Sequence, residues 1–318
     1  MDGGQKPAAR PGTGSVSLTR TRTRRSVGEQ AIKAVLAAAA VLSVLTTAGI
    51  VVTLITESSK FFGEVPFGEF FFGTDWAPLA GGESRSFGVV PLIWSTLYLT
   101  FIALLVAVPV GLGVGVYLAE YASKRVRKAL KPVIELLAGI PTIVFGYFAL
   151  TFFTPLLKDT AGIELQVFNG LSGGIILGIL VLPTIASVSE DAMSAVPQSL
   201  REGAFGLGAA KWQVVVRVIF PAALSGIVAA LVLGASRAIG ETVVILVASG
   251  NNPNLAFDLT IAHQNMAAFI ANVARSDVSA GSVAYATIFA VGMSLFVMTF
   301  ALNLVAIRFV RKYRQIYE

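Results

Sequence analysis

Six long apolar stretches, separated by short polar segments, dominate the pattern of this chain. A helix needs about 20 consecutive apolar residues to cross the hydrocarbon core of a bilayer. The first stretch is too long for the apolar core of a signal peptide, which runs to roughly 7–15 residues, so we expect it to stay uncleaved. The chain is therefore predicted to be an all-α polytopic membrane protein. The six predicted spans are Ala34–Thr56, Val89–Leu118, Val133–Leu157, Leu171–Ser189, Ala222–Ser249 and Val283–Ile307.

Composition agrees with this pattern. Of the 318 residues, 55% are hydrophobic and only 13% are charged, whereas a soluble domain carries about 25% charged residues. Mean hydropathy is +0.77. Cysteine is absent and His263 is the single histidine, so the sequence offers no disulfide, no thiolate chemistry and no histidine cage for a metal. We expect neither a metal site nor a cofactor.

The basic residues predict the orientation. Short cytoplasmic loops carry an excess of Lys and Arg. The N-terminal tail, the loops between spans two and three and between spans four and five, and the C-terminus together hold 19 Lys and Arg, against 4 on the other side. Both termini are therefore predicted to be cytoplasmic. The net charge of +6 follows from these basic loops, so no nucleic-acid partner is expected.

Three polar regions complete the predicted organisation. Residues 1–28 are rich in Gly, Pro, Ser, Thr and Arg, which predicts a disordered basic tail near anionic headgroups, and residues 29–318 form the membrane domain. The external loop of residues 57–88 is rich in Phe. Its aromatics favour an interfacial helix seated at the headgroups, and the alternative is a docking surface for an external partner. The longest cytoplasmic loop covers residues 189–220.

This cytoplasmic loop is patterned as two short amphipathic helices broken at a glycine. Pro197 can begin the first helix, and Leu200, Ala204 and Leu207 are expected to share one apolar face. Gly208 allows the chain to reverse. The second helix is expected to present a further apolar face through Trp212, Val215 and Val216. Small residues along the loop leave room for another protein to approach.

The same loop resembles the EAA loop of ABC-importer permeases. Its residues follow that family's pattern from Glu202-Gly203-Ala204 through Gly208 to Val218-x-Phe220-Pro221, with Gly203, Val218 and Phe220 as conservative departures. The resemblance implies a type I ABC-importer permease fold in a bacterial plasma (inner) membrane. It also implies that the loop couples the chain to a cytoplasmic ATPase. The coupling residues would be Glu202, Gly203, Ala204, Gly208 and Pro221.

Three further segments are similar to the phosphate importer permeases, in particular the PstC-like subunit. They are Gly73–Leu97 in the external loop and second span, Glu135–Gly146 in the third and Ser236–Thr242 in the fifth. The resemblance covers residues 60–318. It implies one permease subunit of an ATP-driven phosphate importer, with a paralogous second permease, two copies of an ATPase and an external phosphate-binding protein as partners. An importer of another oxyanion, such as molybdate, sulfate or phosphonate, is the alternative.

Catalysis is not expected of this chain. No Gly-Lys dipeptide occurs in it, so it lacks the phosphate-cradling motif of an ATPase and energy must come from a partner. A membrane-embedded enzyme would need a cluster of catalytic residues in the spans, where only Arg237 and Glu241 lie deep. A second alternative is a secondary transporter, which would need no ATPase, and co-purification with an ATPase subunit would separate this case from the importer. The expected mechanism is alternating access driven by closure of the ATPase.

Arg237 and Glu241 are the candidate residues of the substrate path. Four residues apart in an apolar span, they are expected to share one helical face and to pair with each other or with a neighbouring subunit, because a charge at mid-bilayer costs about 2.5–3.5 kcal/mol. The Arg237 guanidinium matches phosphate oxygens, which favours an anion contact. The alternative is a structural ion pair that fixes helix packing.

The remaining charged and small residues have simpler interpretations. Glu120 and Glu135 are expected to be solvated or paired beside the basic second loop. Glu190 and Asp191 could gate the cytoplasmic mouth or pair with Arg201. We expect His263 to be an ordinary loop residue. Gly111, Gly113 and Gly115 predict close packing between helices rather than a dinucleotide loop.

Overall fold

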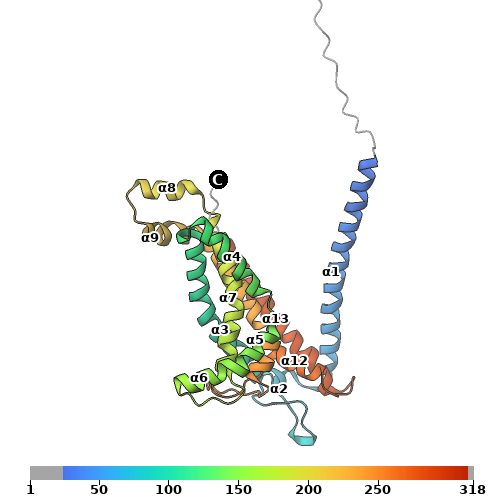
Figure 1. Ribbon diagram of the computed structural model, residues 1–318. Coiled ribbons are helices and arrows are strands. Elements are labelled where there is room, and N and C mark those ends of the chain that lie inside the picture. Colours follow the sequence, from blue (N-terminus) through green and yellow to red (C-terminus); the bar gives the residue numbers. More distant parts are fainter. Residues whose placement is uncertain (1–23, 314–318) are drawn as a thin grey trace, which may run out of the picture. The chain divides into compact units, whose positions relative to one another are not determined.

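The computed structural model describes residues 24–313 (Figure 1). The chain divides into two compact units, residues 1–52 and residues 53–318, which are described separately. Within the described part of the first unit, the chain forms helix α1 (Arg24–Glu64), which continues into the second unit. The first predicted span lies inside this helix. Most of the tail predicted for residues 1–28 lies outside the described residues.

The described part of the second unit is almost wholly helical. Its external segment contains α2 (Phe67–Phe72), the two-residue strands β1 (Trp76–Ala77) and β2 (Ser86–Phe87), which pair antiparallel, and the 3₁₀ turn η1 (Gly82–Ser84) between them. The helices of the first half are α3 (Val90–Val116), α4 (Lys124–Ala138), α5 (Thr142–Phe148), α6 (Thr154–Ala161) and α7 (Gly170–Ser194). Those of the second half are α8 (Gln198–Gly206), α9 (Lys211–Val214), α10 (Phe220–Ala222), α11 (Leu224–Ile239), α12 (Met266–Ala274) and α13 (Val283–Tyr313). Five-residue π-helical turns extend or join these helices: η2 (Tyr117–Tyr121), η3 (Ala149–Phe153), η4 (Val215–Ile219) and η5 (Ile245–Ser249).

By length and composition, four helices in the described residues can each cross a membrane, and the total is six if each of two bent helix pairs forms one span. The bent pairs are residues 124–161, which turn by 86° between α4 and α5, and residues 211–239, which turn by 72° between α10 and α11. The first bend lies at Gly139-Ile140-Pro141, where proline cannot continue the hydrogen bonding of α4. Two of the six predicted spans are therefore broken helices, which agrees with the all-α membrane fold but corrects the picture of six simple rods.

The fifth predicted span ends differently from the expectation. Helix α11 ends at Ile239, and the chain leaves helical geometry at Gly240, Glu241 and Thr242 before η5 begins. The span predicted for Ala222–Ser249 is thus two helical pieces separated by a short break. This break contains one of the two candidate residues of the substrate path.

Helices α3 and α7 pack closely along their length, because glycines replace side chains where the two backbones approach. A Cβ on Gly178 of α7 would lie 2.7 Å from the Ala103 carbonyl oxygen of α3. On the α3 side, a Cβ on Gly115 would lie 3.2 Å from the Ala186 carbonyl oxygen, and one on Gly111 would touch Ile185. The predicted glycine packing is confirmed for Gly111 and Gly115. A Cβ on Gly113 would have no neighbouring atom within 4 Å, so this glycine does not contribute to the packing of the two helices.

Three apolar clusters follow one another along α3. The external cluster includes Val89 and Leu92 of the α3 region, the middle cluster Leu99, Ala103 and Ala107. The cytoplasmic cluster joins the last turns of α3 to Met193 and Val196 near the end of α7 and to Ile219 and Ile227. In Figure 1, α2, α6 and α12 lie at one end of this bundle, and α8 and α9 extend beyond the other.

The Phe-rich external segment is part of the core and not one interfacial helix. Residues 57–64 continue α1, and α2 is only six residues long. Phe61, Phe70 and Trp76 are buried with Phe269 of α12, and the Trp76 and Phe269 rings meet edge to face at 4.9 Å. Phe67 and Phe72 remain exposed. The aromatics of this segment therefore serve mainly to join the external ends of α3, α12 and α13.

Candidate functional site

The cytoplasmic loop forms the predicted pair of short helices. Pro197 directly precedes α8, and the chain reverses at Gly208, whose φ is +81°. At such a φ a residue with a Cβ is strained, so glycine is needed here. The Ala209 amide donates to the Ala204 carbonyl at 3.1 Å, a bond that closes the end of α8. Helix α9 and η4 then lead back to the bundle, so α8 and α9 project from it as a two-helix loop (Figure 1).

The apolar faces of this loop differ from the expected ones. Leu200 and Ala204 pack inward against the cytoplasmic cluster, as predicted, but Leu207 is 91% exposed because it caps α8 just before the reversal. In the second helix Val215 is buried while Trp212 and Val216 are exposed. The π-helical turn η4 begins at Val215 and shifts the side-chain register away from that of a regular α-helix. The loop therefore exposes apolar side chains at Phe205, Leu207, Trp212 and Val216.

The five residues assigned to coupling by resemblance occupy different positions in the loop. Glu202, Gly203 and Gly208 are exposed, and a Cβ on Gly203 would meet no neighbouring atom. Ala204 faces the bundle. Pro221 is exposed in α10, next to the bend before α11. Glu202, Gly203 and Gly208 are therefore accessible to another protein, whereas Ala204 helps to hold α8 in place.

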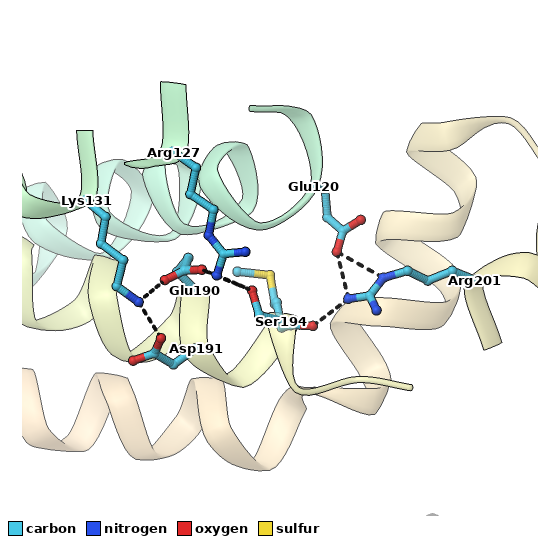
Figure 2. A network of polar contacts seen from close by, with 8 residues as sticks. Glu120, Arg127, Lys131, Glu190, Asp191, Ser194 and Arg201 are labelled. Carbon is cyan, nitrogen blue, oxygen red and sulfur yellow. Dashed lines mark hydrogen bonds and ion pairs between the residues drawn. The ribbon is translucent and has the colours of Figure 1, made fainter. Parts of the chain in front are cut away.

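Arg201 connects this loop to the bundle (Figure 2). Its guanidinium pairs with the Glu120 carboxylate in η2, with Nη2 at 3.0 Å and Nε at 3.3 Å from Oε1. The same side chain donates to the carbonyl oxygens of Val196 at 2.6 Å and Met193 at 2.8 Å. The Met193 carbonyl lies in the last turn of α7 and the Val196 carbonyl two residues beyond the helix, and a cationic donor satisfies both.

Glu190 is the centre of a second group of charges (Figure 2). Its side chain is fully buried near the end of α7 and pairs with Arg127 and with Lys131, whose Nζ lies 2.6 Å from Oε2. Lys131 also contacts Asp191 at 2.6 Å. A buried carboxylate needs such partners because desolvation of an unpaired charge costs several kcal/mol. Two basic residues of α4 are thereby fixed to α7.

These contacts change the expected pairing of the acidic residues. Glu190 and Asp191 were expected to gate the mouth or to pair with Arg201, but they pair with α4, and Arg201 pairs with Glu120. The i, i+4 spacing of Arg127 and Lys131 places both on one face of a helix, and this signal could have identified the pairing. No pattern in the sequence predicted the ion pair between Glu120 and Arg201.

Arg237 and Glu241 do not form the expected pair, since no ion pair joins them among the described residues. Arg237 is half-buried near the end of α11, and its Nη1 donates to Thr184 Oγ1 of α7 at 2.9 Å. Glu241 lies in the break after α11. Its carboxylate accepts the backbone amides of Val243 at 3.0 Å and Val244 at 3.2 Å, as an N-cap does. The two residues share no helical face, because the helix ends between them.

His263 is buried and not an ordinary loop residue. Its Nε2 lies 2.8 Å from the Asp258 carbonyl oxygen and its Nδ1 3.4 Å from Ser95 Oγ of α3. Because a carbonyl can only accept, Nε2 carries the proton of the neutral ring. Burial lowers the pKa of His263. The residue thus fastens the external loop to α3, and no group of three or more possible metal ligands occurs in the described part of the chain.

Up to six apolar spans, two of them broken, and a helical loop that projects from the bundle define a multi-pass membrane protein. The chain belongs to the family of binding-protein-dependent transport system inner membrane components, whose family model matches residues 111–315. It lies in the cell's inner membrane, as this family does.

The chain is similar to named permease proteins over most of its length. A probable ABC transporter permease protein, YqgH of Bacillus subtilis, is 32% identical over 95% of this chain and 97% of that protein. The phosphate transport system permease protein PstC of Haemophilus influenzae is 34% identical over 85% of this chain and 89% of that protein. Among solved structures, a bacterial ABC transporter for the import of alginate contains a chain with a TM-score of 0.64 at 16% identity, over 92% of this chain and all of that one. This last likeness shows the fold alone.

Proposed function

We propose that the chain is one permease subunit of an ATP-driven importer of inorganic phosphate. The observation that carries the proposal is the similarity to phosphate transport permeases over most of the chain, including 34% identity to the Haemophilus influenzae protein. Further phosphate permeases, from Mesorhizobium japonicum and Methanocaldococcus jannaschii, are 30% and 29% identical. Phosphate specificity in this chain is our inference from these relatives.

Arg237 supplies the anion contact of the proposed path. Thr184 is the one hydrogen-bond partner of Arg237 within the described residues, so most of the guanidinium fork is available to a ligand. A guanidinium can donate two parallel hydrogen bonds to phosphate oxygens. Glu241 shapes the break beside it by capping the next helical turn. The role of Glu241 in the proposed path is therefore to position the backbone rather than to bind the anion.

The other components complete the importer. A second, paralogous permease would form the other half of the path, and an external phosphate-binding protein would deliver the anion. Two copies of an ATPase would bind the coupling loops. The exposed Glu202, the accessible glycines and the apolar side chains of Phe205, Leu207 and Trp212 support a docking surface here. Closure of the ATPases would move the loops and rock the helices between inward-open and outward-open states.

The test of the proposal is transport by the complete complex in proteoliposomes. Labelled phosphate should accumulate when ATP is inside and the binding protein outside, and unlabelled phosphate should compete. Excess molybdate, sulfate or phosphonate should not compete. If one of these anions competes at a concentration at which unlabelled phosphate does not, that oxyanion and not phosphate is the substrate. Accumulation that persists without the ATPase would make the chain a secondary transporter.

A further inference from the structure

Arg201 holds three elements together at the cytoplasmic end of the bundle (Figure 2). It belongs to α8, it pairs with Glu120 in η2, which follows α3, and it donates to one carbonyl in the last turn of α7 and to one just after it. Glu202, the next residue, is exposed on α8. Consecutive residues of the loop therefore face opposite ways, one toward the surroundings and one into the bundle.

The pair between Arg201 and Glu120 is largely buried. The two side chains are 12% and 10% exposed. Surface ion pairs contribute little to stability because water and salt screen them, but a desolvated, charge-assisted pair holds its geometry more firmly. The planar guanidinium also fixes the direction of its hydrogen bonds. Arg201 is thus a stiff connection between the loop and the bundle.

The space beside this connection is not filled by packed side chains. A cavity of about 410 Å³ lies there, and Glu120, Arg127, Gln198, Arg201 and Lys211 are among the residues that line it. Leu200 and Ala204 pack α8 against the cytoplasmic cluster. The ion pair links α8 directly to η2 beside this cavity.

The partners of Arg201 adjoin the closely packed α3–α7 pair. Glycines bring α3 and α7 into close contact, and a Cβ on Gly115 would lie 3.3 Å from the Glu190 amide nitrogen. Glu190 in turn fixes Arg127 and Lys131 of α4. These contacts form a continuous chain from Arg201 to α3 and α7 and, through Glu190, to α4. The π-helical turn η2 that carries Glu120 is a kind of irregularity that often occurs at functional sites.

We propose that Arg201 is a positioning residue for energy coupling: through Glu120 and the end of α7 it transmits the movement of the ATPase-bound loop into the α3–α7 pair. This role rests on the proposed function, because it presupposes an ATPase that moves the loop. It differs from the role of Glu202 and Gly208, which lie on the outer side of the loop.

The experiment compares Arg201→Met, Arg201→Lys and Arg125→Met in the complete complex in proteoliposomes. Arg125 is an exposed cation of α4 and serves as the matched control. We expect Arg201→Met to raise the ATP consumed per phosphate imported about tenfold, within the usual range of coupling between sites. Arg201→Lys should recover part of the coupling, since lysine keeps the positive charge but lacks the planar set of hydrogen-bond donors of the guanidinium. Arg125→Met should match the wild type. A wild-type ratio in Arg201→Met, with the complex assembled, would overturn the proposal.

A second measurement does not depend on the transported substrate. The chain contains no cysteine, so spin labels can be placed at Ser199→Cys on α8 and Lys124→Cys at the start of α4, both exposed positions. If Arg201 transmits the movement, the distance between the labels should stay constant on trapping with ATP and vanadate, and should shift or broaden in Arg201→Met. A distance that changes equally with and without Arg201 would contradict the proposal. If the wild type shows the constant distance but imports no phosphate, the proposed function fails while the role of Arg201 stands.

Discussion

Arg237 of α11 donates a hydrogen bond to Thr184 of α7 at 2.9 Å. The bond crosses between two helices of the bundle and leaves the guanidinium without a carboxylate partner in the described part of the chain. An intramembrane arginine is costly and is usually retained for a function. The guanidinium is therefore available to the proposed anion, or to a carboxylate of a neighbouring subunit.

We expect Arg237→Gln to reduce phosphate uptake about tenfold or more while the complex still assembles, because glutamine retains a donor for Thr184 but loses the charge. A tenfold loss corresponds to about 1.4 kcal/mol, a modest value for a charge-assisted contact to phosphate. Uptake of labelled phosphate by whole cells measures the effect. Thr184→Val is the control, since it removes the hydrogen bond and keeps the charge. Equal losses in both variants would make the role of Arg237 structural.

Glu190 provides a test of the buried charge group. Glu190→Gln leaves Arg127 and Lys131 without their buried partner, and we expect a loss of stability of about 3 kcal/mol, the low end for breaking a buried pair, because both cations reach water. Asp191→Asn is the matched control. The Asp191 side chain is 62% exposed, so its loss should cost less than about 1 kcal/mol. Thermal unfolding in detergent compares the two, and equal midpoints would contradict the assignment.

Gly208 tests the geometry of the coupling loop. Its φ of +81° costs a residue with a Cβ about 1–2 kcal/mol, and valine more because it is β-branched. We expect Gly208→Val to reach the membrane but to lose phosphate uptake and binding of the ATPase. Gly206 is also exposed and has no neighbour within 4 Å of a built Cβ, but it has no positive φ. Gly206→Ala should therefore be tolerated better than Gly208→Ala. Wild-type uptake by Gly208→Val would sink the assignment of the loop.

His263 predicts a pH dependence of stability. Burial lowers its pKa below 6.5, so the folded chain favours the neutral ring more than the unfolded chain does. The stabilisation is complete above about pH 6.5 and is lost as the pH falls below that value, because the unfolded state then binds more protons. Asp258 stays ionised here, since hydrogen bonds from Thr260 lower its pKa. Melting temperatures between pH 7.5 and 5.5 should fall more steeply in the wild type than in His263→Gln, and parallel slopes would refute this.

Much of the fold could be predicted from the sequence because lipid imposes simple requirements. The apolar length of each span, the basic loops and the glycine reversal at Gly208 are local features, and local features are visible in one sequence. The close approach at Gly111 and Gly115 was predictable for the same reason. The coupling loop was recognisable by its spacing.

The remaining features depend on contacts between distant segments. The break at Gly240–Thr242 looks like continuous apolar helix in the sequence, since Glu241 acts as a cap only where its carboxylate meets the Val243 and Val244 amides. The pair of Glu120 with Arg201 joins residues 81 positions apart. Burial of His263 depends on Ser95, 168 positions away. The hydrophobic periodicity of a sequence does not show which distant residues come into contact.

The most direct test of the central claim is uptake of radiolabelled phosphate by cells that lack this chain. Deletion should abolish high-affinity uptake, and the wild-type chain should restore it while Gly208→Val should not. Sulfate uptake in the same cells should be unchanged. Undiminished phosphate uptake after deletion, in cells with no second phosphate importer, would contradict the account.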